Sequence, residues 1–246
     1  MIMRARNLST AMLCLLMWHS APAAYAIECV VLLHGLARTS HSMDEMAQHL
    51  VQAGYAVANI NYPSRDHTIA ELAPMAINEG IERCNQQDAH RIHFVTHSLG
   101  GILVRQYLAS SAWPANNPEL GRVVMLGPPN QGSEIVDNLK DIPGYELWNG
   151  PAGNQLGTDA NSIPRQLGPV NFELGVIAGT DTMNPLLSQY LPGPNDGKVS
   201  VISTKVEGMT DFISLPTTHT FMMNNDEVIS QATFFLMNGR FDHQTP

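Results

Sequence analysis

The stretch of residues 91–105 constrains the fold of this chain more than any other part of the sequence. It begins with a short apolar run, continues through Thr-His-Ser-Leu-Gly-Gly, and then repeats apolar residues at helical spacing. We therefore expect a strand, a tight turn that presents Ser98, and a helix that starts directly after the turn. Gly100 and Gly101 would let this helix approach the strand closely. A strand that leads straight into a helix is typical of a parallel sheet with helices packed on it.

The turn at Ser98 matches a motif that exposes a serine side chain. Residues 96–100 fit the pattern G-x-S-x-G, except that Thr96 replaces the first glycine. In that pattern a strained elbow holds the hydroxyl above the carboxyl edge of the sheet, beside the free N–H groups of a helix N-terminus. Ser98 is therefore a candidate nucleophile. Short motifs also occur by chance, so the alternative is an ordinary strand-to-helix turn.

Strand and helix patterns alternate through the first half of the chain. Apolar runs predict further strands over residues 28–33, 55–61, 122–126, 172–179 and 199–204. Thr68 and Glu71 have the spacing of a helix capping box, and a final helix is expected from about residue 224 until Gly239. The order predicts an α/β fold over residues 27–246, with a mostly parallel sheet of about six strands and helices on both faces.

The regular pattern breaks over about residues 127–170, where Pro, Gly and Asn become frequent and Tyr145, Leu147 and Trp148 lie among them. A long irregular segment inside a compact domain is usually functional. This one follows a strand whose carboxyl end lies at the same sheet edge as Ser98. We predict a small lid-like insertion; the alternative is a rigid covering loop whose aromatic residues form a minor core.

Residues 1–26 have the features of a secretory signal peptide. Arg4 and Arg6 precede an apolar stretch over residues 11–18, and Ala-Tyr-Ala at 24–26 is a small-x-small cleavage site. The apolar stretch is shorter than the roughly 20 residues that span a bilayer. We expect a secreted or periplasmic protein with no integral membrane span after processing; an uncleaved N-terminal anchor is the alternative.

The charge balance excludes some classes of partner. Cleavage after residue 26 would remove two of the 13 Lys and Arg residues and none of the 22 Asp and Glu residues, so the net charge would change from −9 to −11. An acidic chain argues against nucleic acid and against anionic membranes as partners.

Two cysteines would remain after cleavage. Cys29 opens the first predicted strand, and Cys84 closes the helix that precedes the Ser98 strand. Both are therefore expected at the sheet edge opposite Ser98. In an oxidising compartment we predict a disulfide between them; two free buried thiols are the alternative.

A serine hydroxyl becomes an effective nucleophile when a neutral histidine accepts its proton and a carboxylate orients that histidine. In folds with this elbow the chain order is Ser, then Asp or Glu, then His. Only His219 and His243 follow Ser98, and His243 lies in a polar C-terminal tail, so His219 is the predicted base. For the carboxylate we favour Asp196, in a tight Asn-Asp-Gly turn, over Asp181, which directly follows a predicted strand.

Acyl transfer also needs N–H donors for the oxyanion of its tetrahedral intermediate. The backbone N–H of Leu99 directly follows the nucleophile, and Leu36 is the candidate from the loop after the first strand. His34 and His97 precede Ser98, so we assign them to packing or hydrogen bonding around the site. The chain has no His-x-His or His-Glu-x-x-His spacing, and we predict neither a metal site nor a cofactor.

Four segments together carry a resemblance to a known family. They are Val-Leu-Leu-His-Gly-Leu at 31–36, Phe-Val-Thr-His-Ser-Leu-Gly-Gly at 94–101, Leu-Gly-Pro-Pro-Asn-Gln-Gly-Ser at 126–133 and Asn-Asp-Gly-Lys-Val at 195–199. In this order they resemble the α/β-hydrolase superfamily, and specifically its bacterial secreted lipases and esterases. The resemblance implies a compact six-stranded version of that fold and an ester hydrolase. The implied site residues are Ser98, Asp196 and His219, with Leu36 and Leu99 at the oxyanion.

The resemblance also bears on two open points. In such lipases the segment similar to residues 195–199 carries the acid, which supports Asp196 over Asp181. At Asn130 the relatives usually have a histidine, so no role is carried over to that position.

The sequence thus predicts a serine hydrolase that cleaves carboxylic esters through an acyl-enzyme on Ser98, with a small acyl ester or a lipid as substrate. An acyltransferase or a thioesterase would use the same acyl-enzyme. A binding protein that kept the fold without the chemistry is the non-enzymatic alternative.

Overall fold

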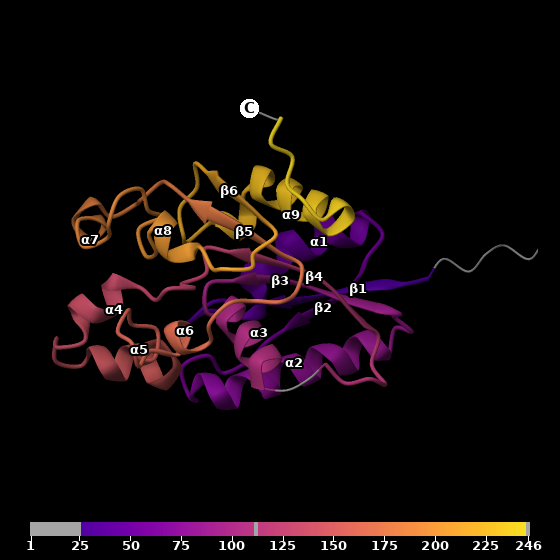
Figure 1. Cartoon of the computed structure of the whole chain (residues 1–246), viewed down its shortest axis with the longest axis horizontal. Coiled ribbons are helices and arrows are strands. Elements are labelled where there is room, and N and C mark those ends of the chain that lie inside the picture. The colour runs from indigo at the N-terminus through magenta and orange to yellow at the C-terminus, as the bar shows by residue number, and fades with distance from the viewer. Residues whose placement is uncertain (1–25, 111–112, 245–246) are drawn as a thin grey trace, which may run out of the picture.

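The chain forms one six-stranded sheet in the order β2-β1-β3-β4-β5-β6 (Figure 1). The structure is a computed structural model that describes residues 26–110 and 113–244, so the predicted signal peptide lies outside the described residues except for Ala26. The strands are β1 (Glu28–Leu33), β2 (Ala56–Ile60), β3 (Arg91–His97), β4 (Glu119–Leu126), β5 (Leu174–Gly179) and β6 (Asp211–Leu215). All neighbouring pairs are parallel, and the predicted six-stranded α/β fold is confirmed.

The inner strand β1 is apolar on both faces, as expected for a sheet that helices cover on both sides. In β1, Val31 and Leu33 belong to one core cluster, whereas Val30 and Leu32 belong to another, and all four are fully buried. Successive side chains of a strand point to opposite faces, so these two clusters are the two cores of the domain.

Two pairs of helices cover the two cores. They are α2 (Ile69–Asn85) with α3 (Leu99–Ser110), and α1 (Asp44–Gln52) with α9 (Asp226–Asn238). Figure 1 shows the pairs on opposite sides of the sheet. Helix α2 begins with the predicted capping box, in which the Thr68 N–H donates to Glu71 Oε2 at 2.9 Å. None of the helices in the described ranges is long and apolar enough to cross a bilayer.

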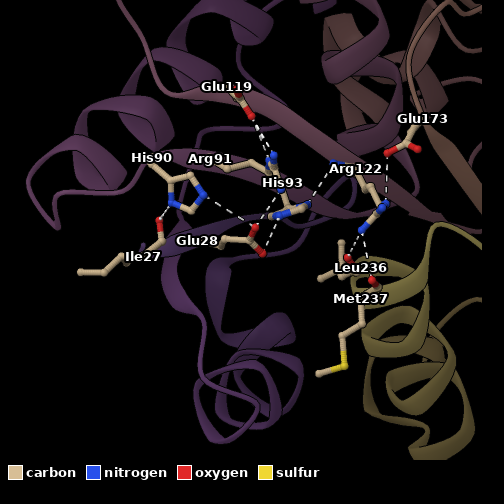
Figure 2. Close-up of polar contacts among 10 residues, drawn as sticks. All are labelled: Ile27, Glu28, His90, Arg91, His93, Glu119, Arg122, Glu173, Leu236 and Met237. Carbon is tan, nitrogen blue, oxygen red and sulfur yellow. Dashed lines mark hydrogen bonds and ion pairs between the residues drawn. The ribbon is translucent and has the colours of Figure 1, made fainter. Parts of the chain in front are cut away.

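Charged side chains join the starts of the strands at the sheet edge away from Ser98 (Figure 2). Arg91 donates to Glu28 Oε1 at 3.0 Å and to Glu119 Oε2 at 2.7 Å. The buried His93 lies beside Glu28, with 3.3 Å between His93 Nε2 and Glu28 Oε2. Its Nδ1 accepts the backbone N–H of Arg122 at 2.9 Å. This network fixes β1, β3 and β4 relative to one another at the end of the sheet that does not carry the candidate site.

The predicted disulfide between Cys29 and Cys84 is present, with 5.7 Å between the Cα atoms. It ties the start of β1 to the last turn of α2, and both residues are fully buried. The bridge closes a loop with a sequence separation of 55 residues. A cross-link over a loop of this length restricts the unfolded chain far more than the folded one.

Replacement of both cysteines by alanine is therefore expected to lower the free energy of unfolding by about 2–4 kcal/mol. For a domain of this size that corresponds to a loss of roughly 5–15 °C in Tm, measured by calorimetry. A reducing agent should lower the Tm of the unmodified protein by a similar amount. The same treatment should leave the Tm of the double variant unchanged. An equal Tm for the oxidised and reduced proteins would contradict the stabilising role.

Two predicted elements differ from the structure. Residues 127–170 contain three short helices, α4 (Glu134–Leu139), α5 (Tyr145–Asn154) and α6 (Ile163–Gln166), where an irregular segment was expected. The strand predicted over residues 199–204 is wrong, because Val201–Thr204 forms helix α8 and the sixth strand lies later in the chain. Ser200 explains the error: its side chain accepts the Ser203 N–H, a helix N-cap that an apolar pattern does not reveal.

Buried Arg105 attaches the segment of residues 127–170 to α3. Its guanidinium donates to the carbonyl of Asn130 at 2.9 Å and to those of Pro164 and Gly168 at 3.2 and 2.7 Å. Burial lowers the pKa of Arg105 to about 10, so the group stays protonated at neutral pH. Asn130 is fully buried as well, and its side chain also donates to the Thr204 carbonyl at 2.8 Å.

Substitution of Arg105 by lysine is expected to lower the free energy of unfolding by about 2–4 kcal/mol, since an ammonium group lacks the planar fork that reaches these separated carbonyls. Urea denaturation measures the loss. Arg165→Lys provides the control, because Arg165 is exposed and makes a single side-chain bond to Gln131. Equal stabilities for the two variants would contradict the role of Arg105.

Candidate active site

Ser98 occupies a sharp elbow between the last residue of β3 and the first residue of α3. Its φ is 53°, in the left-handed region that few residues other than glycine adopt. The Ser98 N–H donates to the Leu126 carbonyl at 2.9 Å, which joins the elbow to β4. A side chain at Gly100 would come within 2.7 Å of the Leu33 carbonyl, so the helix can pass this close to the sheet only with glycine at that position.

His219 lies next to Ser98 in the loop between β6 and α9. The Ser98 hydroxyl and His219 Nε2 are 3.0 Å apart, and His219 Nδ1 is 2.7 Å from Asp196 Oδ2. A neutral imidazole satisfies both contacts when it accepts the hydroxyl proton at Nε2 and donates its Nδ1–H to the carboxylate. All three side chains are largely buried: Ser98 is 9% exposed, His219 5% and Asp196 2%.

The carboxylate of Asp196 is held from both sides. Its Oδ1 accepts the backbone N–H groups of Lys198 and Val199 at 3.0 and 2.8 Å. The backbone carbonyl of Asp196 accepts the backbone N–H of His219 at 3.0 Å. A Cβ at Gly127 would lie 2.9 Å from Asp196 Oδ2, so only glycine at this position leaves room for the hydrogen-bonded pair of Asp196 and His219. Asp181 is exposed, and among the described residues its carboxylate has no hydrogen bond or ion pair to His219, so the structure brings Asp196 rather than Asp181 to the histidine.

The loop after β1 runs along the other side of Ser98. A Cβ at Gly35 would lie 3.2 Å from Ser98 Cβ. Within the described residues, the backbone N–H groups of Leu36 and Leu99 have no hydrogen-bond acceptor. The next N–H in the loop, that of Ala37, donates to Ser64 Oγ at 3.0 Å and is therefore occupied. Leu36 and Leu99 thus each have a backbone N–H without an acceptor, in the two segments that flank Ser98.

Two further histidines support the site without reaching the hydroxyl. His97 Nε2 donates to the His219 carbonyl at 2.9 Å, and complete burial lowers the pKa of His97 well below its usual range. His34 stacks on Tyr62, with 4.1 Å between the ring centroids, and burial lowers its pKa too. Both rings are therefore neutral, in agreement with the packing and hydrogen-bonding roles expected from the sequence.

A cavity of about 280 Å³ opens above Ser98 and His219. Much of its wall is apolar and comes from Pro129, Ile135, Val136, Leu139, Leu156 and Val199. Arg38 and Lys198 line the same cavity. These residues lie on segments that are separated along the chain and meet only after folding, so no local pattern identified them as the lining of one cavity. Among the described residues, no three His, Cys, Asp or Glu side chains are grouped as metal ligands.

Comparison with solved structures identifies α/β hydrolases. The mature lipase BlEst2 of Bacillus licheniformis has a TM-score of 0.62 and 19% identity, over 81% of this chain and 87% of that one. The phospholipase PlaB of Legionella pneumophila has a TM-score of 0.62 and 19% identity, over 85% of this chain but 57% of its own. A metagenomic carboxyl esterase, MGS0156, has a TM-score of 0.61 and 19% identity, over 80% of this chain and 65% of that one. At these identities the likeness establishes the fold.

The sequence itself is also similar to a characterised family. Among curated proteins, no sequence matches the chain. A model of the family described as palmitoyl protein thioesterase matches residues 29–163, which is more than half of the chain. The match extends from β1 to the first residue of α6 and so includes Ser98 and the Leu36 loop. The chain, an α/β hydrolase by fold, therefore belongs to the palmitoyl protein thioesterase family.

Proposed function

We propose that the protein is a serine hydrolase that cleaves carboxylic esters and thioesters through an acyl-enzyme on Ser98. The single observation that carries the proposal is the continuous line of hydrogen bonds from the Ser98 hydroxyl through His219 to Asp196. A serine, an imidazole and a carboxylate in this arrangement activate the hydroxyl as a nucleophile.

In the first half of the reaction, Ser98 Oγ forms a bond to the acyl carbon while its proton moves to His219 Nε2. The imidazolium that results is stabilised by Asp196 at Nδ1. When the intermediate collapses, the bond to the leaving group breaks and His219 returns the proton to the departing oxygen or sulfur. In the second half, water gives a proton to His219 while its oxygen bonds to the acyl carbon. The bond between that carbon and Ser98 Oγ then breaks, His219 returns the proton to Ser98 Oγ, and the acid is released.

The negative charge of the tetrahedral intermediate needs donors that are already in position. We assign this role to the N–H groups of Leu36 and Leu99, which have no acceptor within the described residues. Donors of this kind are worth about a hundred- to a thousandfold in rate each.

We propose that the acyl chain occupies the apolar part of the cavity. There the wall is formed by Pro129, in the loop that follows β4, and by Ile135 and Leu139 of α4. The family match favours thioesters as natural substrates, whereas the structural neighbours are described as a lipase, a phospholipase and a carboxyl esterase. Both bond types pass through the same acyl-enzyme, so we expect turnover of both.

The disulfide favours an oxidising compartment, because cytosolic thiols are kept reduced. Together with the signal-like residues 1–26, it supports the proposal that the protein acts in the periplasm or outside the cell.

Hydrolysis of p-nitrophenyl butyrate, together with labelling by a fluorophosphonate, tests the proposed activity. We expect turnover and a single labelled peptide that contains Ser98. A series of esters and thioesters from butyryl to palmitoyl then measures the preference for acyl length and for the bond cleaved. Absence of both turnover and labelling would end the enzymatic interpretation in favour of a binding protein.

A further inference from the structure

A second cavity adjoins the active-site cavity. Its volume is about 650 Å³, and it lies between the loops that follow β1 and β2. About half of its wall is polar, with side chains that include Thr39, Asn61, Ser64 and Asp66. The two cavities share Ala37 and Arg38, the residues that directly follow Leu36. A substrate at Ser98 that reached the second cavity would therefore pass along the loop that carries Leu36.

Three positive side chains line the two cavities. Arg38 lines both, Arg65 lines the second cavity, and Lys198 lines the first. Arg38 donates to the Thr220 carbonyl at 3.2 Å, and the Arg65 guanidinium lies 6.0 Å from the centroid of the Trp148 ring. Within the described part of the chain, none of these three cations forms an ion pair.

The cations also act on one another. Burial lowers the pKa of Lys198, and the nearby positive charge of Arg38 lowers it further, which outweighs the opposite effect of Asp196. Asp196 is already engaged by His219, and Asp66 is the acidic residue that lines the second cavity. Three cations and one carboxylate without an ion pair in the described residues thus leave a positive surplus on the walls of the two cavities, in a chain whose net charge is −9. A concentration of like charge against the overall charge of a protein attracts a ligand of opposite sign.

We propose that the second cavity binds the leaving group of the substrate and that this leaving group carries a phosphate, held by Arg38 and Arg65 with Lys198 of the neighbouring cavity. The proposal rests on the esterase and thioesterase activity proposed above and adds the chemical class of the group that is released. A phosphate monoester carries close to two negative charges near pH 7, which balances the surplus of the three cations over Asp66. Arginine forks match the oxygen atoms of phosphate with paired hydrogen bonds.

Two matched substrate pairs test the preference for phosphate and identify its source. The first pair is decanoyl-CoA and S-decanoyl-N-acetylcysteamine, which share the acyl chain and the thioester. The second is 1-decanoylglycerol 3-phosphate and 1-decanoylglycerol, which share the acyl chain and the ester. We expect kcat/KM to favour the phosphate-bearing member of at least one pair by about 30-fold or more, and about 0.5 M sodium chloride to reduce this ratio. Preference in the first pair indicates a nucleotide-type thiol, and preference in the second a phospholipid headgroup.

Variants connect the ratio to the named residues. Arg38→Gln and Arg65→Gln should each lower the ratio of kcat/KM within a pair by about tenfold. This is the effect expected when a charge-assisted hydrogen bond is lost at a partly exposed site. Arg65 makes no contact with the His219 loop in the described residues, so Arg65→Gln tests the charge even if loss of the Thr220 contact disturbs Arg38→Gln. Arg83→Gln is the control, because it removes the same charge from α2, where Arg83 pairs with Glu79 at 2.6 Å. The control should keep the ratio of the unmodified protein.

The outcomes separate this proposal from the proposed activity. Turnover of the neutral substrates with ratios near one in both pairs, or a ratio that Arg65→Gln and Arg83→Gln leave equally unchanged, overturns the phosphate site alone. No turnover of any substrate and no fluorophosphonate labelling overturns both proposals.

Discussion

Replacement of Ser98 by alanine is expected to lower kcat/KM for p-nitrophenyl butyrate by about 10⁴- to 10⁶-fold, because the variant has no oxygen to form the acyl-enzyme. His219→Ala should cause a loss of similar size, since Ser98 then has no base within 3.0 Å of its hydroxyl. The double variant should be little worse than either single variant, because the two groups act as one unit. Rates are measured at substrate concentrations well below KM, with fluorophosphonate labelling as an independent readout.

The controls separate lost chemistry from lost structure. Ser98 has a positive φ, so Ser98→Gly, which suits that backbone, should be as inactive as Ser98→Ala while its Tm stays close to that of the unmodified protein. Ser110→Ala removes an exposed hydroxyl from the far end of the same helix and should keep full activity. His243 is the other histidine that follows Ser98 in the chain, and His243→Ala should also keep full activity. Retention of more than a few per cent of activity by a folded Ser98 or His219 variant would remove that residue from the mechanism.

Replacement of Asp196 by asparagine is expected to lower kcat by about 10³- to 10⁴-fold with little change in KM. The asparagine oxygen can still accept the N–H groups of Lys198 and Val199. Its amide nitrogen would then face His219 Nδ1, and two donors cannot share a hydrogen bond. The imidazole would take the other tautomer, with its proton on Nε2, and could no longer accept a proton from Ser98.

Asp181→Asn is the matched control for this variant. Asp181 is exposed, so the substitution should change kcat by less than about threefold, as expected for a surface residue away from the site. Stopped assays over a range of substrate concentrations give kcat and KM for both variants. A larger loss at Asp181, or a loss below tenfold at Asp196, would reverse the assignment of the acid.

Signals that are local in the chain were sufficient to predict most of the fold. The apolar runs identified five of the six strands, and the spacing of Thr68 and Glu71 marked the start of α2. The sixth strand was misplaced, because residues 199–204 are apolar enough for a strand but a buried serine side chain starts a helix there. In β6, by contrast, Asp211 and Ser214 interrupt the apolar pattern, and pairing with β5 makes the segment a strand. Long-range pairing of this kind leaves no periodic signal in the sequence.

The sequence by itself determined the type of fold, the elbow at Ser98 and, through the order of residues along the chain, the candidate base His219 and the candidate acids Asp196 and Asp181. These follow from short-range backbone preferences and from the direction in which parallel strands end. Only the tertiary structure decided which aspartate meets the histidine, that Arg105 and Asn130 attach the segment of residues 127–170, and that Arg38, Arg65 and Lys198 line two neighbouring cavities. Those features depend on distances between side chains from separate loops, which are set when the two cores pack and not by any local pattern.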